Sequence, residues 1–122
     1  MTGGTPRVVL VEDDPSMSRA IERILHIGGF TTETFATAEA ALAADAAMAD
    51  CLVLDVRLPG MSGFDLYRLL ASGDRPPAIF ITAHDSPGVR ETAGGMDAAG
   101  YLPKPFSGRS LLDAVARVLG SP

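Results

Sequence analysis

An unbroken run of apolar residues at 51–54 leads directly into Asp55 and a Leu-Pro-Gly turn. Short apolar runs bounded by turn residues are typical of strands that are buried on both faces of a parallel sheet. Asp55 would then lie at the carboxyl end of such a strand, which is where ligands bind in open α/β sheets. An aspartate there can equally cap a turn or a helix, so its role depends on what ends the other strands.

Strand-like runs alternate with helix-like segments along the chain. Strands are predicted at 7–11, 51–54, 78–82 and 100–103, with a more polar edge strand at 30–35. Capping residues and helical apolar spacing predict helices at 15–27, 37–48, 62–72, 87–98 and 107–119, the fourth weakened by three glycines. Because the connections are short, they have to be right-handed crossovers. The pattern predicts an α/β fold, a five-stranded parallel doubly wound sheet in the flavodoxin-like order 2-1-3-4-5 within a three-layer α/β/α arrangement.

The bulk properties narrow the class of protein. A chain of 122 residues suits one domain, here predicted at 7–120 between a flexible N-terminus at 1–6 and a short end at 121–122. The formal net charge of −5 disfavours direct nucleic-acid binding. A single cysteine excludes an internal disulfide and suits a reducing compartment, and no apolar run is long enough to span a membrane. A cytoplasmic location is therefore predicted.

Reactive side chains follow four of the predicted strands. Asp13 and Asp14 follow the first, Asp55 the third, and Thr82 and Lys104 the fourth and fifth. Three carboxylates within about 4–5 Å of one another repel by several kcal/mol at an effective dielectric near 20, so the cluster needs a cation. An oxygen-only, partly hydrated site is what Mg²⁺ prefers. With the metal present, ionised Asp55 could attack a phosphoryl group whose oxygens the Lys104 ammonium and the Thr82 hydroxyl would bind.

From about residue 7 to 120 the chain resembles the receiver domains of two-component response regulators. The family pattern is an acidic pair, a phospho-acceptor aspartate, a threonine or serine, and a Lys-Pro, one after each of four strands. These motifs match Asp13 and Asp14, Asp55, Thr82 and Lys104-Pro105, and the loop at 58–63 also matches. The resemblance implies that Asp14, Asp55 and the backbone carbonyl of Arg57 bind Mg²⁺, with Asp13 acting mostly through water.

The resemblance also implies a signalling role. Asp55 would accept a phosphoryl group from a histidine kinase or a histidine phosphotransfer protein, and Tyr101 would report the switch through its rotamer. Arg57, Ala83 and His84 occupy positions that tune dephosphorylation. The domain would be no enzyme in the usual sense, although it assists its own phosphorylation and autodephosphorylation. Phosphorylation would change the face made by 87–119 and so control an output domain, a partner or a homodimer.

Other interpretations of these residues stay open at this point. Thr82 could be an ordinary strand residue, Tyr101 a core aromatic, and Arg57 and His84 solvated loop residues. A haloacid-dehalogenase-type phosphatase would need a carboxylate where Arg57 stands, and a flavin carrier of this fold would need a phosphate-binding loop where the acidic run lies. A pseudo-receiver would usually lack an acidic or lysine position, and none is missing. The sequence leaves open the kinase, the pathway and whether the chain is part of a longer regulator.

Overall fold

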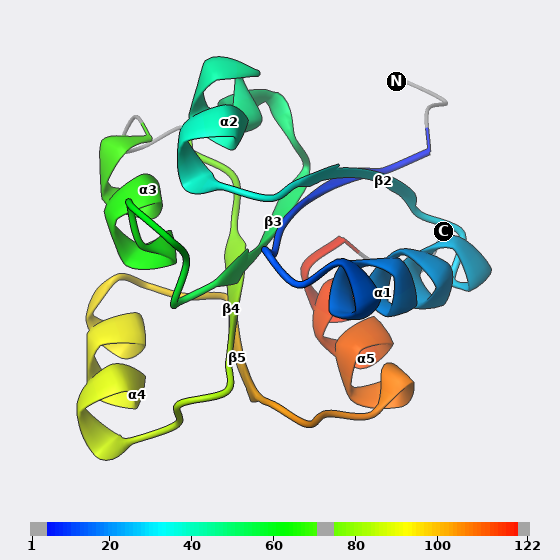
Figure 1. Ribbon diagram of the computed structural model, residues 1–122. Coiled ribbons are helices and arrows are strands. Elements are labelled where there is room, and N and C mark those ends of the chain that lie inside the picture. The colour runs from blue at the N-terminus through cyan, green and yellow to red at the C-terminus, as the bar shows by residue number, and fades with distance from the viewer. Residues whose placement is uncertain (1–4, 71–74, 120–122) are drawn as a thin grey trace.

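Five parallel strands form one sheet between two layers of helices in the computed structural model, which describes residues 5–70 and 75–119 (Figure 1). The strands are β1 (Arg7–Val11), β2 (Thr31–Phe35), β3 (Cys51–Asp55), β4 (Ala78–Thr82) and β5 (Gly100–Pro103). Their order in the sheet is β2-β1-β3-β4-β5, which confirms the predicted doubly wound topology. The register sets Val11 opposite Leu54 and Asp55 opposite Ile81, so the carboxyl ends of the central strands lie level with one another.

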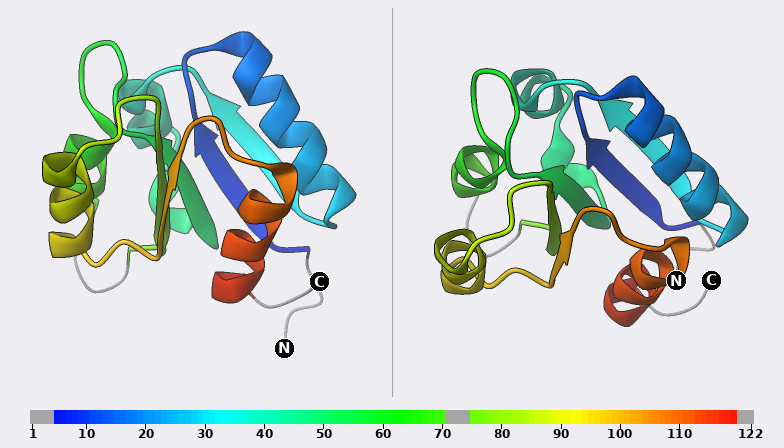
Figure 2. Two further views of the ribbon diagram at one scale, coloured as in Figure 1. Left: turned by 90° about the horizontal axis from the view of Figure 1, so that it is seen from below. Right: turned by 60° about the horizontal axis from the view of Figure 1, so that its bottom comes forward.

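The helices lie on both faces of the sheet (Figure 2). They are α1 (Pro15–Ile27), α2 (Ala38–Ala43), α3 (Gly63–Leu69), α4 (Pro87–Gly95) and α5 (Gly108–Leu119), with a 3₁₀ turn, η1 (Ala46–Met48). α1 and α5 cover one face, and α2, α3 and α4 cover the other (Figure 1). None of the described helices has the length and apolar character needed to cross a membrane.

Alternate side chains of each central strand enter two separate apolar layers. Val8, Leu10 and Val53 pack with α1 and α5, whereas Leu52 and Leu54 pack with the helices of the opposite face. Every residue of β3 is buried, as the unbroken apolar run predicts. Fully burying side chains of this size contributes about 1.5–3 kcal/mol each, so these two layers provide the main stabilisation of the sheet.

Cys51 is a core residue, as predicted. Burial, with a smaller contribution from the charge of Asp50, raises the pKa of its thiol to about 12. The thiol is therefore protonated at neutral pH and has no thiolate character.

Three helix boundaries differ from the sequence prediction. The alanine-rich segment predicted as one helix over 37–48 is interrupted by Asp45, whose φ of 66° turns the chain and brings Ala46 and Ala49 into the core. The helix predicted over 87–98 ends at Gly95, and Asp97 adopts a φ of 57°. The helix predicted over 62–72 ends at Leu69, and its predicted last residues lie partly outside the described residues. At Asp45 and at Asp97 the turn toward the next strand overrides the local helix propensity.

Candidate functional site

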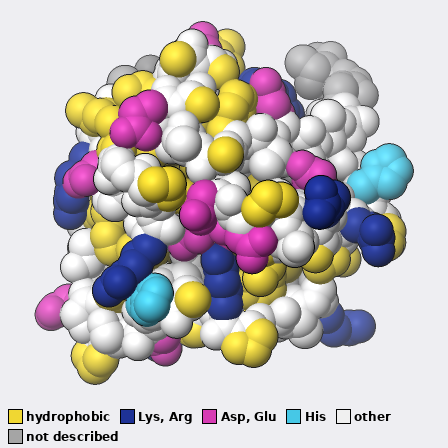
Figure 3. Space-filling model, in the orientation of Figure 1, with side chains coloured by type: hydrophobic (Ala, Val, Ile, Leu, Met, Phe, Trp, Pro, Cys, Tyr) yellow, Lys and Arg dark blue, Asp and Glu magenta, His cyan; other side chains and the backbone are white. Residues whose placement is uncertain are grey.

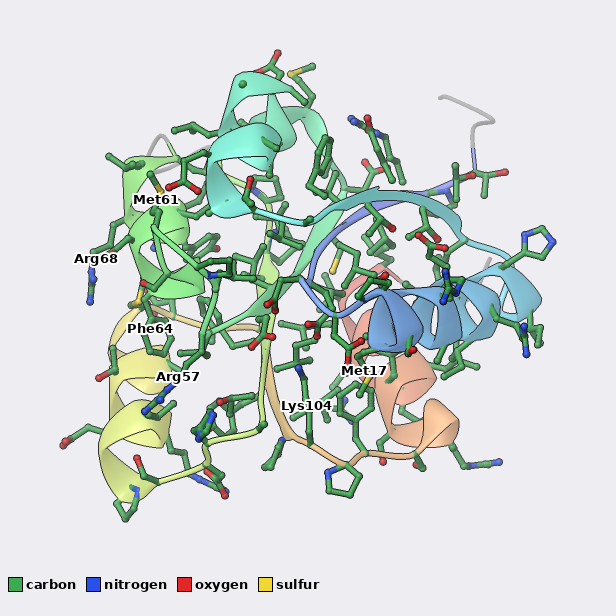
Figure 4. The ribbon with its side chains drawn as sticks, in the orientation of Figure 1. Met17, Arg57, Met61, Phe64, Arg68 and Lys104 are labelled. Atoms are coloured by element: carbon green, nitrogen blue, oxygen red, sulfur yellow. The ribbon has the colours of Figure 1, made fainter. Side chains whose placement is uncertain are left out.

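Three carboxylates and one ammonium group meet at the carboxyl edge of the sheet. Carboxylate oxygens of Glu12, Asp13 and Asp55 lie within 4.8 Å of one another. The ammonium of Lys104 lies 2.7 Å from Glu12 Oε1 and 3.0 Å from Asp55 Oδ2. Acidic side chains gather near the centre of the face in Figure 3, and Lys104 extends toward this position between β5 and α1 in Figure 4. The site therefore joins the ends of β1 and β3 to the loop after β5.

The charged groups of this cluster are largely withdrawn from water. The side chains of Glu12, Asp55 and Lys104 are 1%, 7% and 13% exposed, whereas Asp13 is exposed. Burial alone would lower the pKa of Lys104, but its hydrogen bonds to Glu12 and Asp55 and the charges of both outweigh burial and raise that pKa. Lys104 is therefore charged at neutral pH, and three carboxylates face one ammonium group.

The acidic cluster of the structure contains Glu12 in addition to Asp13 and Asp55, and Asp14 lies outside it. Asp14, predicted as a metal ligand, is exposed, and its Oδ1 accepts a hydrogen bond from the backbone N–H of Ser16 at 3.0 Å, so it caps α1. Glu12, which the sequence analysis did not select, takes the third place in the cluster. A signal was available in Pro15, because proline at the first helical position makes Asp14 the N-cap, and a capping carboxylate is directed at the helix.

The N-terminus of α3 packs against the backbone of Asp55 and the residue that follows it. Asp55 Oδ1 accepts a hydrogen bond from the backbone N–H of Arg57 at 3.2 Å, and the N–H of Gly63 donates to the carbonyl of Val56 at 3.0 Å. A Cβ atom at Gly63 would lie 2.2 Å from the carbonyl oxygen of Asp55. Because only a residue without a side chain fits there, α3 can begin directly against the end of β3.

A second contact fixes the loop that follows Asp55. Gly60 adopts a φ of 77°, and Glu39 of α2 accepts a hydrogen bond from the backbone N–H of Met61 at 3.0 Å. A Cβ atom at Gly60 would lie 2.7 Å from Glu39 Oε2. The loop is thus tied to the first turn of α2 as well as to α3.

Thr82 lies at the same edge of the sheet on β4. It is fully buried, and its Oγ1 accepts a hydrogen bond from the backbone N–H of His84 at 2.9 Å. Its carbonyl accepts from the backbone N–H of Lys104 at 2.7 Å, which connects the end of β4 to the residue that holds Asp55. The structure therefore brings Thr82, Lys104 and Asp55 to one edge, as the strand pattern predicts.

The remaining predicted residues lie around this edge. Arg57, Ala83 and His84 are exposed in the loops after β3 and β4, and Arg57 extends toward α4 (Figure 4). Tyr101 on β5 is half-buried, and its hydroxyl donates to Asp85 Oδ1 at 2.8 Å. Asp85 was not selected from the sequence, because its contact with Tyr101 joins residues 16 positions apart.

The donor set fits Mg²⁺. The cluster offers carboxylate oxygens, which are the ligands of hard divalent cations, and it lacks the nitrogen and sulfur ligands typical of zinc sites. One ammonium group does not neutralise three carboxylates, so a divalent cation would lower their mutual repulsion. Asp13 is the exposed member of the cluster, and a cation that keeps part of its water shell can approach it from solvent.

Comparison with known proteins gives consistent matches. The family model described as response regulator receiver domain matches residues 8–116. Nodulation protein W of Bradyrhizobium diazoefficiens is 45% identical over 114 residues, covering 88% of this chain and 48% of that protein. The C4-dicarboxylate transport transcriptional regulatory protein DctD of Rhizobium meliloti is 34% identical, covering 92% of this chain and 25% of that protein. The chain thus spans half or less of the length of these two relatives.

A solved structure agrees in fold over nearly the full length of both chains. The crystal structure of a response regulator receiver protein from Burkholderia phymatum superposes with a TM-score of 0.85 at 43% identity. The match covers 97% of this chain and 98% of that one.

Proposed function

The chain belongs to the family of response-regulator receiver domains, and on this premise we propose that a histidine kinase or a histidine phosphotransfer protein phosphorylates it on Asp55. Receiver domains are signalling domains of two-component systems, and phosphoryl acceptance at an acidic Mg²⁺ pocket is typical of them. The observation that carries the proposal is the position of Asp55, a buried carboxylate whose Oδ2 lies 3.0 Å from Lys104 Nζ. Phosphorylation would control an output domain or a partner protein.

The residues of the site divide the work of phosphoryl transfer. A carboxylate oxygen of Asp55 forms the bond to phosphorus while the phosphorus–nitrogen bond of the donor histidine breaks, and the bonding pair stays on the imidazole. Lys104 donates a hydrogen bond to Asp55 and, after transfer, donates hydrogen bonds to the phosphoryl oxygens, where negative charge accumulates. The hydroxyl of Thr82, whose oxygen accepts from the backbone N–H of His84, donates its own proton to another of these oxygens.

Asp13, Asp55 and the backbone carbonyl of Arg57 would hold Mg²⁺, which supplies positive charge that offsets the carboxylates and the phosphoryl oxygens. Glu12 positions Lys104 through the 2.7 Å ion pair and would reach the metal through water. Asp14, which the sequence pattern suggested as a direct ligand, acts in this proposal as the cap of α1.

The exposed loop residues would set the lifetime of the phosphorylated form. Arg57 and His84 flank the acceptor edge, and Ala83 leaves the approach of water to Asp55 open. The read-out surface in this proposal is α4, β5 and α5, which would contact the output domain or a second copy of the chain. These residues and faces are assigned by the family resemblance and by their position beside the site.

Incubation with acetyl phosphate and Mg²⁺ tests the proposed function directly. We expect one phosphoryl group per chain that is stable to acid and labile to hydroxylamine, as an acyl phosphate is. Labelling should disappear when the metal is chelated, and intact-protein mass spectrometry with and without hydroxylamine measures it. A chain that stays unlabelled in the presence of Mg²⁺ and a large excess of donor would contradict the proposal.

The metal assignment predicts opposite outcomes for two adjacent aspartates. Asp13→Asn should weaken Mg²⁺ binding by about tenfold or more, because it removes a carboxylate from the cluster. Asp14→Asn should leave the affinity within about twofold, since asparagine caps a helix as well as aspartate does. Isothermal titration calorimetry with Mg²⁺ measures both. A larger loss in Asp14→Asn than in Asp13→Asn would restore the assignment made from the sequence.

A further inference from the structure

We propose that Asp85 and Arg90 form a latch that holds the hydroxyl of Tyr101 at the loop after β4 and so favours the unphosphorylated conformation. The inference rests on the proposed function, because it gives phosphorylation at Asp55 a specific contact to break. It assigns positioning roles to two residues that the acceptor site itself does not include.

One carboxylate makes both polar contacts of the latch. The hydroxyl of Tyr101 donates to Asp85 Oδ1 at 2.8 Å, and Arg90 Nη2 donates to Asp85 Oδ2 at 2.7 Å. The guanidinium carbon of Arg90 also lies 5.1 Å from the centroid of the Tyr101 ring. An exposed ion pair contributes little by itself, but here the pair also fixes the direction in which an aromatic side chain points. The three groups join the loop after β4, α4 and β5.

The same short loop holds the hydroxyl of Thr82. The backbone N–H of His84 donates to Thr82 Oγ1 at 2.9 Å, and His84 directly precedes Asp85. If the Thr82 side chain moves toward a phosphoryl group on Asp55, either the backbone of His84 moves with it or this contact lengthens. Movement of His84 displaces Asp85 because the two are adjacent in the chain. The loop therefore transmits a change at Thr82 to the hydroxyl of Tyr101.

α4 is suited to move when the latch is released, because few of its side chains enter the core. Of its residues, all of which the structure describes, Ala93 alone is buried. Arg75 anchors its C-terminal end, donating to the carbonyls of Met96 at 3.2 Å and Tyr67 at 3.0 Å. The Asp85–Arg90 pair ties its N-terminal half to the loop. Release of the latch would thus free the N-terminal half of α4 while the other end stays attached to α3.

Asp85→Ala tests the latch, and Asp65→Ala is its matched control. Asp65 forms an exposed pair with Arg68 at 3.1 Å on α3, so the control also removes one carboxylate and one ion pair. We expect Asp85→Ala to be phosphorylated by acetyl phosphate about fivefold faster than wild type, the lower end of typical allosteric couplings. Asp65→Ala should match wild type.

A second measurement needs no phosphorylation. The chain has two tyrosines and no tryptophan, so absorbance of tyrosinate follows the two phenols alone. Burial first, and then the hydrogen bond to Asp85 and its charge, raise the pKa of Tyr101. In Asp85→Ala one phenol should therefore ionise at lower pH than in wild type, and in Asp65→Ala neither should change.

The outcomes separate this inference from the proposed function. An unchanged phenol titration in Asp85→Ala would show that Asp85 does not hold Tyr101 and would overturn the latch. A shifted titration with an unchanged phosphorylation rate would overturn it equally, because the contact would then be unconnected to the acceptor site. In both cases a labelled wild type leaves the proposed function standing. An unlabelled wild type would overturn the proposed function and, with it, the latch.

Discussion

Asp55→Asn is expected to abolish phosphorylation by acetyl phosphate and by any histidine donor. Asparagine preserves the shape of the side chain, but its amide oxygen carries no full negative charge and is a far weaker nucleophile than a carboxylate. The substitution also removes the 3.0 Å ion pair between Asp55 and Lys104, so Glu12 becomes the one remaining ion-pair partner of Lys104 in this cluster. Mass spectrometry after incubation with donor and Mg²⁺ should show unmodified chain.

The loss should not come from unfolding. The substitution removes the repulsion of Asp55 by Glu12 and Asp13 together with its attraction to Lys104, and these changes offset one another. We therefore expect the free energy of unfolding to stay within about 1 kcal/mol of wild type, as measured by urea denaturation.

Asp50→Asn is the matched control for the acceptor. Asp50 precedes the same strand at its opposite end, where its Oδ2 accepts a hydrogen bond from the backbone N–H of Arg7 at 2.7 Å. The variant should be labelled like wild type, because an asparagine oxygen can accept the same bond. Labelling of Asp55→Asn at the wild-type rate would place the acceptor elsewhere.

Gly63→Ala is expected to destabilise the fold by about 3 kcal/mol or more, at or above the upper end of usual overpacking costs. The added Cβ atom would lie 2.2 Å from the carbonyl oxygen of Asp55, and a backbone atom cannot move aside as the end of a flexible side chain can. Either α3 has to shift away from the sheet or the end of β3 has to move. The rate of phosphorylation should fall along with the free energy of unfolding, because Asp55 itself would be displaced.

Gly94→Ala is the control for this substitution. Nothing lies within 4 Å of a Cβ atom at Gly94, and the residue lies within α4. Alanine there should stabilise the protein by up to about 1 kcal/mol, because it has the higher helix propensity. Urea denaturation of both variants gives the comparison. A Gly63→Ala variant as stable as wild type would show that α3 does not rest against Asp55 as described.

The sheet could be predicted from the sequence because each central strand is a short apolar run with turn residues on either side. All residues from Val8 to Val11 and from Ala78 to Ile81 are buried. Because strands buried on both faces are apolar at every position, the apolar run alone is enough to predict them. Asp55, Thr82 and Lys104 could be placed for the same reason, since each directly follows or ends a strand.

The features that were not predicted depend on where the chain turns. The turn between the end of β1 at Val11 and the start of α1 at Pro15 determines which residues of the run Glu12-Asp13-Asp14 enter the acidic cluster. The interruption at Asp45 depends on the core accepting Ala46 and Ala49, and the propensity of alanine alone favours an unbroken helix. The contact between Asp85 and Tyr101 joins the loop after β4 to β5 across 16 positions of sequence, which no local pattern encodes.

The two apolar layers of the domain are nearly independent of each other in their effect on stability. The layer under α1 and α5 includes Ile21 and Leu111, and the layer under α4 includes Ala93 and Phe80, with the sheet between them. Residues that share no partner have nearly additive effects on stability, so repacking one layer leaves the other almost unchanged. Substitutions of core residues beside α1 can therefore accumulate without changing how α4 packs on the opposite face of the sheet.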